Sequence, residues 1–300
     1  MADCIRSIIN SPAEYSREII VVDNASEDGV ADMVEKDFPN VRLIRNSENY
    51  GFAKANNIGM EASRGRYFCL ANSDTLIRDN ALDKMCQYMD ANQEVAVLGP
   101  KLLWPDLTLQ LSCRKFPSLA NTLCPAIGLT RLFPDMPFFG GEHMGYFRHD
   151  KTLEVDALVG AFLMVRSEAV KSVGLMDEHY FFYCEEIDWC RRFKNAGWKN
   201  TFFPEAEVIH IGQGSASQEP TRFKREFIQS NCRYWTKYHS RLERWVYFII
   251  MLFRYTVRLV FNSVVYVVVP SLRKKTGKSL CGSAEAIKAL FAVTRGSGIV

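Results

Sequence analysis

The stretch that most restricts the fold is an apolar run, Tyr67-Phe68-Cys69-Leu70-Ala71, which ends directly in Asn72-Ser73-Asp74. A short run of this kind predicts a strand buried in a sheet. In open α/β sheets, ligand-binding groups lie in the crevice beyond the carboxyl ends of the strands. We therefore expect Asp74, with Asn72, to face such a crevice, where their oxygens suit a hard divalent cation. The alternative is that both residues only begin the next turn.

Strands and helices alternate around this run. Before it, the pattern predicts a helix at 3–10, a strand at 18–23, a helix at 30–37, a strand at 41–44 and a helix that begins at Gly51. After it, we expect a helix through Leu82, Met85 and Met89 and a strand at 95–98. Ordered runs are expected at 153–156 and 161–165, a short helix from Ser167, a helix at 186–196, and strand-like runs at 201–203 and 208–211. This β-α-β-α-β alternation with short links is typical of a doubly wound, parallel sheet. The irregular segment 104–150 is interpreted as a flap or an acceptor-facing surface.

Composition excludes several classes of protein. A chain of 300 residues with 48% hydrophobic content can bury a large core. A net charge of +3, without aromatic residues interleaved in a basic stripe, gives no support for nucleic acid as a partner. The nine cysteines are scattered and include no Cys-x-x-Cys pair, which indicates reduced thiols. The first residues lack the apolar run of a secretory signal, so we expect a cytoplasmic protein.

The C-terminal part differs from the rest. Residues 245–269 are nearly all apolar, with Arg254, Arg258 and Asn262 as interruptions, and a helix of this length rises roughly 37 Å. It is long enough to span a membrane, but a central Arg costs roughly 2.5 to 3.5 kcal/mol, so lying in the interface competes with spanning. Residues 237–278 carry nine Lys or Arg and one acid, which favours an anionic cytoplasmic membrane surface. We predict a domain at 1–240 and a basic, membrane-associated helical region at 241–300.

Acidic residues mark two further places. Asp23 and Asp28, at a strand end and in the turn after it, are able to accept hydrogen bonds from a nucleobase and a ribose, or serve as turn and cap residues. Glu185, Glu186 and Asp188 open a helix beside four aromatic residues. Acids there stabilise the helix dipole, but partly desolvated carboxylates also suit general-base chemistry.

A single histidine follows on an apolar strand. His210 lies in Val208-Ile209-His210-Ile211-Gly212. Such a histidine is more often a core residue than a ligand. The residues around it leave both interpretations open.

Six motifs, in this order and spacing, resemble the family 2 glycosyltransferases, and in particular a rhamnosyltransferase-like branch. They are VVDNASEDG, NSENYGFAKANNIGM, GRYFCLANSDT, VDALVGAFLMVRSEAV, GLMDEHYFFYCEEIDWCRRFKNAGW and VIHIGQGS, within about residues 3 to 240. The resemblance implies a GT-A fold with a mixed sheet, a nucleotide-activated sugar donor and inversion at the anomeric carbon. It also implies a divalent metal, Mn²⁺ or Mg²⁺.

The resemblance assigns roles to residues of this chain. It implies that Asp74 and His210 bind the metal, with Asn72-Ser73-Asp74 in the place of an Asp-x-Asp motif. It implies nucleotide or donor contacts at Asp23, Asn24, Asp28, Asn49, Gly51, Asn56, Asn72, Asp156 and Gly160. The catalytic base, usually an Asp, corresponds to Glu186, with Asp188 and Glu185 as further candidates. The longer side chain moves the carboxylate by about one bond length, where ~1 Å can matter greatly.

The family pattern normally opens with a strand before the helix at 4–8, and that strand is absent from this sequence. We therefore expect a GT-A fold that lacks its first strand, in a chain truncated at the N-terminus. In a doubly wound sheet this strand is central, so its loss would open the core.

These features together predict an inverting, metal-dependent transfer of a sugar in cell-surface polysaccharide synthesis, at the inner face of the cell membrane. Rhamnose is favoured, from dTDP-rhamnose first and a UDP-sugar second, with a glycan or a lipid-linked glycan as the acceptor. One alternative is a catalytically inactive, truncated protein that binds sugar nucleotides or acts as a scaffold. Another is a nucleotidyltransferase, but the glycine-rich, basic phosphate loop expected near its N-terminus is not seen.

Overall fold

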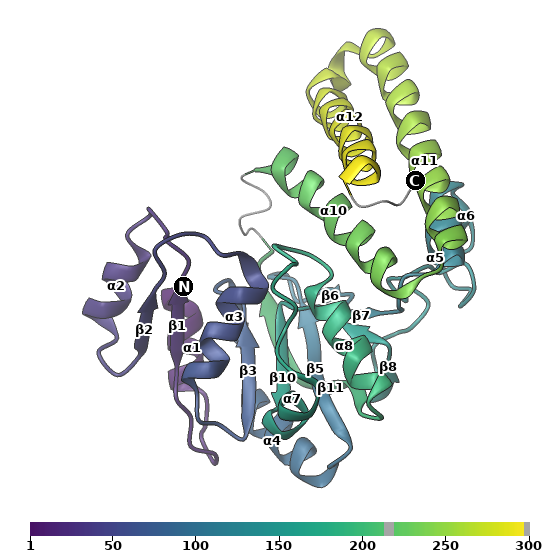
Figure 1. Cartoon of the computed structure of the whole chain (residues 1–300). Coiled ribbons are helices and arrows are strands. Elements are labelled where there is room, and N and C mark those ends of the chain that lie inside the picture. Colours follow the sequence, from purple (N-terminus) through teal and green to yellow (C-terminus); the bar gives the residue numbers. More distant parts are fainter. Residues whose placement is uncertain (213–218, 297–300) are drawn as a thin grey trace. The chain divides into compact units, whose positions relative to one another are not determined.

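The computed structural model describes residues 1–212 and 219–296, and it divides into two compact units (Figure 1). The sheet unit contains Met1–Phe116, Phe147–Phe181 and Glu185–Gly214. The helical unit contains Pro117–Tyr146, Phe182–Cys184 and Ser215–Val300. This grouping follows contacts in space, whereas the predicted division at residue 240 follows the sequence.

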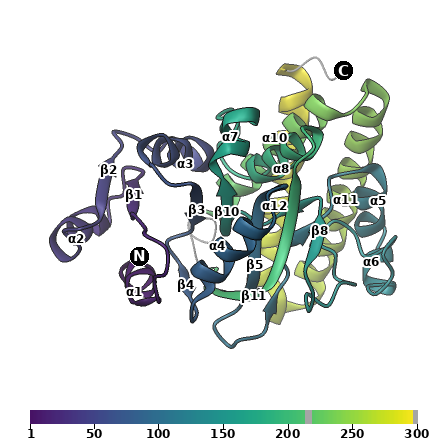
Figure 2. The same ribbon diagram turned by 90° about the horizontal axis from the view of Figure 1, so that it is seen from below.

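A small parallel sheet opens the sheet unit. Strands β1 (Ile20–Asp23) and β2 (Arg42–Arg45) pair along their whole lengths, with α2 (Val30–Asp37) between them in sequence. The helix α1 (Ala2–Asn10) contributes Ile5 to a buried cluster with Val21 and Val34. Figure 2 shows this small sheet beside α3 (Gly51–Ala62). The helices and strands expected up to residue 62 are confirmed.

The large sheet of the unit has seven strands in a mixed arrangement. Its main order is β3 (Tyr67–Ala71), β10 (Phe162–Arg166), β5 (Val95–Leu103), β11 (Lys199–His210) and β4 (Thr75–Ile77). Strands β6 (Leu109–Gln110) and β8 (Leu153–Val155) attach to β5 and β11. Strands β5 and β11 run parallel and the other pairs are antiparallel. The α/β class with a mixed sheet is therefore confirmed.

The pairing of the first strands differs from the expectation. The β-α-β-α-β pattern predicted one parallel sheet, but β1 pairs with β2 while β3 pairs antiparallel with β10. Among the described residues, β1 and β3 each keep one edge without a strand partner. Apolar runs identify a strand but not its neighbour, which depends on packing between distant segments. The absence of a family strand stays a prediction.

Two segments further along the chain differ in part from the expectation. Residues 201–203 and 208–211 belong to one strand, β11, whose register shifts between Phe203 and Glu207, around Pro204, which has no N–H for the ladder. The segment 104–150 also contains regular structure: β6, β7 (Cys113–Arg114), which pairs with β9 (Ala157–Leu158), and the helices α5 (Leu119–Ala126) and α6 (Leu129–Leu132). The hydroxyl of Ser118 caps α5 by accepting a hydrogen bond from the N–H of Asn121.

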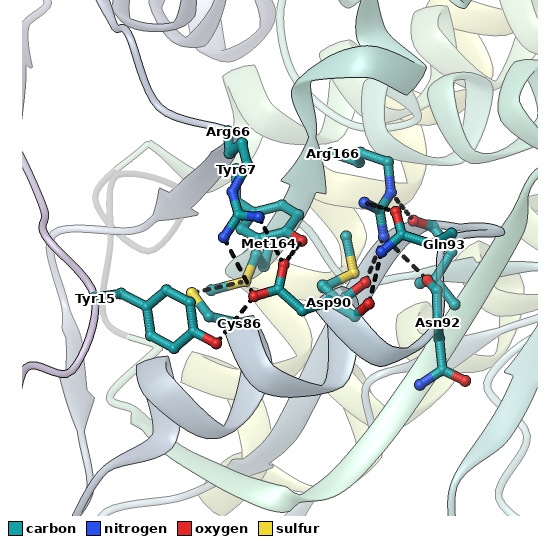
Figure 3. Close-up of polar contacts among 11 residues, drawn as sticks. Tyr15, Arg66, Tyr67, Cys86, Asp90, Asn92, Gln93, Met164 and Arg166 are labelled. Atoms are coloured by element: carbon teal, nitrogen blue, oxygen red, sulfur yellow. Dashed lines mark hydrogen bonds and ion pairs between the residues drawn. The ribbon is translucent and has the colours of Figure 1, made fainter.

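The remaining helices of the sheet unit are α4 (Ala81–Ala91), α7 (Ser167–Val173) and α8 (Glu185–Asn195). Met85 and Met89 of α4 are fully buried against the large sheet. At the end of α4, Asp90 accepts hydrogen bonds from the hydroxyls of Tyr15 and Tyr67 (Figure 3). Burial and this bond to Asp90 raise the pKa of Tyr67 to about 12.

A buried cation closes the end of α4. Arg166, the last residue of β10, donates to the backbone carbonyls of Met89, Asn92 and Val95 and to the side chain of Gln93 (Figure 3). Carbonyls at a helix C-terminus have no partner within the helix, and a cation there is also favoured by the helix dipole. The hydrogen bonds of Arg166 therefore hold the end of α4 against the large sheet.

We expect Arg166→Met to lower the free energy of unfolding by about 3 kcal/mol, because it removes the side-chain donor from the buried carbonyls of Met89 and Val95. Urea unfolding of the full chain measures this loss. Arg64→Met, in the exposed connection before β3, removes the same charge without a buried contact and serves as the matched control. Equal unfolding midpoints for the two variants would contradict the stabilising role of Arg166.

The helical unit contains α10 (Pro220–Tyr238), α11 (Arg241–Val268), the short helix η1 (Pro270–Leu272) and α12 (Arg273–Gly296). A capping box between Ser240 and Glu243 begins α11. Helices α11 and α12 lie side by side (Figures 1 and 2). By length and composition α11 is able to cross a membrane, and it confirms the long apolar helix expected at 245–269.

Candidate active site

Asp74 lies in the turn between β3 and β4, where its side chain meets the end of β11. Its Oδ1 is 3.4 Å from Nε2 of His210, and its Oδ2 accepts a hydrogen bond of 3.1 Å from the backbone N–H of Gly212. The backbone carbonyl of Asp74 accepts from the N–H of Ile211. The hydrogen bond with His210 is the main cause that lowers the pKa of the Asp74 carboxyl. The structure thus places the two predicted metal ligands together.

The turn that carries Asp74 is fixed by the backbone of Asn72. Its N–H donates to the carbonyl of Ala161 at 2.9 Å. Its carbonyl accepts from both the N–H and the hydroxyl of Thr75, at 3.1 and 2.7 Å. The end of β3 is therefore tied to the residue that follows Gly160.

The second ring nitrogen of His210 also has a partner. Nδ1 lies 2.8 Å from Oε1 of Gln110, which belongs to β6. Gly212, two residues after the histidine, has φ +71°, and a Cβ there would lie 2.8 Å from the ring of Trp104. A glycine is required at this position because both the backbone conformation and the space exclude a side chain.

The residues present fit a divalent metal. A carboxylate oxygen and an imidazole nitrogen are ligands that first-row divalent ions accept. Two ligand atoms at right angles around an ion, each about 2.1 Å away, are about 3 Å apart, which is close to the 3.4 Å between Asp74 and His210. The described residues hold no group of three or more His, Cys, Asp or Glu that could bind a metal. Further ligands would be water and substrate oxygens.

The predicted nucleotide positions form a second network. Asp23 is buried at the end of β1, and its Oδ1 accepts from the N–H of Ser26. The amide of Asn24 donates to Oδ1 of Asn49 at 3.2 Å and to the carbonyl of Gly51 at 3.0 Å. The turn after β1 and the turn before α3 are thus joined by side chains that the sequence analysis selected.

Asp28 and Asn56 make local contacts. Asp28 is exposed and accepts from the N–H of Val30 at the start of α2. Asn56 donates to the carbonyl of Phe52, one turn earlier in α3. Their contacts agree with the cap and turn interpretation, while the exposure of Asp28 leaves it accessible to a ligand.

A backbone bond connects this network to the acidic helix start. The N–H of Phe52 donates to the carbonyl of Phe181 at 2.8 Å. Gly51 has φ +83°, and a Cβ there would clash with the same carbonyl. Gly160 lies between the two sides, since a Cβ on it would be 3.6 Å from both Phe52 and Glu186. Asn24 is therefore linked to Glu186 through Gly51, Phe52 and Gly160. Ala161, which follows Gly160, is bonded in turn to the turn that carries Asp74.

Glu185 and Glu186 begin α8 with buried carboxylate oxygens. Oε2 of each has no hydrogen-bond partner within residues 1–212 and 219–296. Burial is the main cause that raises the pKa of both carboxyls, and for Glu185 the charge of Glu186 adds to it. The positive charge of Arg114 acts on the pKa of Glu186 in the opposite direction. A carboxylate in such a setting is a stronger base than one in water.

Asp188 has a different setting. It is fully buried, and its Oδ2 accepts a hydrogen bond of 2.8 Å from Nε of Arg192. Arg192 donates in turn to the carbonyls of Val173 and Leu175. This geometry is that of an ion pair that holds α8 against the end of α7.

Asp156 lies away from these contacts. Its carboxylate accepts from the N–H of Phe116 at 3.1 Å and from Lys194 at 2.8 Å. Lys194 follows Glu186 by eight positions in α8, which corresponds to about 12 Å along the axis. Within the described residues, the Asp156 carboxylate is thus held by Phe116 and Lys194, and no contact joins it to Glu186.

Four residues at the site were not selected from the sequence: Trp104, Gln110, Arg114 and Gly212. The glycine had a signal, because it follows the histidine in VIHIGQGS, whose last three residues lie outside the described residues. Gln110 and Arg114 had none, because β6 and β7 have only two residues each. Strands this short carry no readable periodicity.

The chain is similar to known glycosyltransferases. The model of glycosyl transferase family 2 matches residues 1–149. N-acetylglucosaminyl-diphospho-decaprenol L-rhamnosyltransferase of Mycobacterium tuberculosis is 29% identical over 213 residues, which cover 67% of this chain and 69% of the relative. The dTDP-rhamnosyl transferase RfbF of Shigella flexneri is 26% identical over 215 residues, which cover 70% of this chain and 66% of the relative.

A solved structure supports the fold. The mannosyltransferase PcManGT from Pyrobaculum calidifontis, in complex with GDP-Man and Mn²⁺, matches with a TM-score of 0.55 at 13% identity. The match covers 97% of this chain and 83% of that chain. At this identity the likeness shows the fold alone, an α/β sheet of the GT-A type.

Proposed function

Because the chain is a glycosyltransferase and belongs to glycosyl transferase family 2, we propose that it transfers rhamnose, with inversion, from a nucleotide-diphosphate donor to a lipid-linked glycan acceptor. The names of the M. tuberculosis and S. flexneri relatives support rhamnose, and the name of the former supports a lipid-linked acceptor. dTDP-rhamnose is the first donor to test and a UDP-sugar the second.

The observation that carries this proposal is the meeting of Asp74 with His210 at 3.4 Å, in contact through Ala161 and Gly160 with Glu186. Asp74 and His210 would hold a divalent ion, Mn²⁺ or Mg²⁺. Such an ion, when bound, neutralises the charge that develops on a diphosphate leaving group. Asp23, Asn24 and the turn at Asn49 form the side of the site proposed for the nucleotide.

Glu186 is proposed as the general base. Its buried oxygen has no competing partner in the described chain, so it is available to remove the proton of the acceptor hydroxyl during attack on the anomeric carbon. The proton moves to the carboxylate and the diphosphate leaves from the opposite face, so no covalent enzyme intermediate is needed. We assign Asp188, bound by Arg192, to support of the helix. Glu185 is buried beside it, and the charge of Glu186 raises the pKa of Glu185.

Transfer of radiolabelled rhamnose from dTDP-rhamnose to a polyprenyl-diphosphate glycan, with Mn²⁺ present or chelated, tests the proposal. We expect metal-dependent product and release of dTDP. Binding of dTDP without any transfer or hydrolysis would instead favour the alternative, a catalytically inactive binding protein. Parallel reactions with UDP-sugars in place of dTDP-rhamnose show which nucleotide the donor carries.

The surface of α11 supports attachment to the inner face of a membrane. Residues 249, 253, 257, 260, 264 and 267 recur at helical spacing and are exposed apolar side chains. Two of the three polar interruptions, Arg258 and Asn262, point elsewhere, because both donate hydrogen bonds to Ser279 of α12. The stripe is therefore free of these two polar side chains.

Lying in the interface is favoured over spanning. Helix α12 is packed antiparallel to α11, since Ser279 meets residues 258 and 262 while Gly277 meets Tyr266. A spanning α11 would place Arg254, near the middle of the helix, in hydrocarbon, at roughly 2.5 to 3.5 kcal/mol for a central charge. In the interface, Lys274, Lys275 and Lys278 of α12 would contact anionic headgroups, at about 1 kcal/mol each.

We expect Val260→Asp with Val264→Asp to abolish sedimentation with vesicles that contain anionic lipid, because two charges interrupt the apolar stripe. Lys288→Asp, on α12, changes the net charge by the same amount and leaves the stripe intact. If both proteins sediment like the unsubstituted chain, the stripe is not the membrane contact.

A further inference from the structure

We propose that Gln110 is a positioning residue that holds the imidazole of His210 with Nε2, rather than Nδ1, directed to the metal shared with Asp74. The inference rests on the metal-dependent transfer proposed above. Its basis is the 2.8 Å contact between Oε1 of Gln110 and Nδ1 of His210, on the ring side opposite Asp74.

The topology explains how these two side chains meet. Strand β5 pairs with β11 through Leu103 and Ile209, and with β6 through Leu102 and Gln110. The backbones of β6 and β11 therefore lie on opposite sides of β5, about 10 Å apart. Gln110 and His210 bridge this distance across the end of β5. Asparagine, shorter by one methylene, would not reach.

The chemistry of the pair fixes the ring. When a metal replaces the hydrogen bond between Nε2 and Asp74, the proton of neutral imidazole lies on Nδ1, where the amide oxygen of Gln110 accepts it, and the lone pair of Nε2 is left for the metal. That nitrogen faces Oδ1 of Asp74. Partners of a ligating histidine fix its tautomer and orientation, and their loss typically costs about 10- to 100-fold in metal affinity.

The fold does not depend on this side chain. Gln110 is paired to β5 through its backbone, and within the described part of the chain its side chain makes no hydrogen bond other than that to His210. Its oxygen is therefore committed to His210, and substitutions that keep the size of the side chain are expected to fold.

Mn²⁺ titrations of the full chain, followed by electron paramagnetic resonance of the free ion, test the proposal. We expect Gln110→Met and Gln110→Asn to weaken Mn²⁺ binding by about 10- to 100-fold, because one lacks the acceptor and the other the reach. Gln110→Glu keeps both acceptor and reach and is expected to bind at least as tightly as the original chain. Gln87→Met, on the exposed side of α4, makes the same chemical change elsewhere and serves as the control.

The protonation of the His210 imidazole provides a second, independent measurement. With Mg²⁺ bound, the ¹⁵N shifts of His210 are expected to show a protonated Nδ1 and an unprotonated Nε2, and Gln110→Met should lose the protected Nδ1 proton. A protonated Nε2 in the Mg²⁺ complex, or unchanged Mn²⁺ affinity in Gln110→Met, overturns the role of Gln110 and leaves the proposed transfer standing. If the unsubstituted chain binds neither ion, the metal-dependent function fails and this inference fails with it.

Discussion

Asp74→Asn is expected to reduce sugar transfer by at least about 1,000-fold, because a metal that stabilises the leaving diphosphate supplies several kcal/mol and each 1.4 kcal/mol is about tenfold in rate. The amide keeps the size of the side chain but removes the negative charge next to His210. The amide oxygen of the new asparagine is able to accept the hydrogen bond from the N–H of Gly212, so the turn is expected to fold. Mn²⁺ titration and initial rates at saturating donor measure the two losses together.

The matched control is Asp79→Asn, five positions along the chain. Asp79 is exposed and has φ +47°, a conformation that Asn also adopts. The substitution Asp79→Asn therefore removes one negative charge from the same region and leaves both proposed metal ligands unchanged. Transfer by Asp74→Asn at the rate of Asp79→Asn would remove Asp74 from the metal site.

Glu186→Gln is expected to lower kcat by roughly 100- to 10,000-fold, the usual contribution of a positioned base. Binding of dTDP and Mn²⁺ should be unchanged, since the substitution keeps the shape of α8 and leaves Asp74 and Asn24 in place. Steady-state kinetics combined with calorimetric titration of dTDP separates the two effects.

Glu168→Gln is the control for this change. Glu168 is the second residue of α7, as Glu186 is of α8, but it is exposed. The control therefore removes an acid from the first turn of a helix with no loss of a buried base. Equal kcat values for Glu186→Gln and the unsubstituted enzyme would exclude Glu186 as the base and return Glu185 and Asp188 to consideration.

The pH profile follows from the same carboxyl. Burial raises the pKa of Glu186 above its ordinary value of 4.5, and a base acts only when ionised. Activity is therefore expected to fall as the pH decreases through this raised pKa, at a higher pH than an exposed glutamate would give. Loss of the positive charge in Arg114→Gln should move the acidic limb of kcat/KM to still higher pH, because Arg114 lowers that pKa.

The sequence predicted those parts of the site that lie in long, regular elements or in recognisable motifs. Asp74 follows a strand and His210 ends one, and the structure brings them together. The local pattern could not decide what Asp188 and Asp156 do, since their roles depend on Arg192 and Lys194, which reach them only in the folded chain.

Other parts were beyond the sequence for physical reasons. Strand order depends on which edges meet, and the periodicity of β3 is the same whether its neighbour is β1 or β10. The contribution of Gln110 depends on a two-residue strand whose only signature is its pairing with β5. The glycine at Gly51 could be predicted from its place in a turn. The residue that leaves no room for a side chain there, Phe181, lies far along the chain and could not be predicted.

The free edges of β1 and β3 bear on how the chain behaves in solution. Within the described residues each of these strands presents a row of backbone groups with no strand beside it, and such rows are templates for pairing with another molecule. Association of this kind depends on the square of the protein concentration. Dilute conditions therefore favour the single chain, and the metal and nucleotide titrations are best made there, where the edges of one molecule seldom meet those of another.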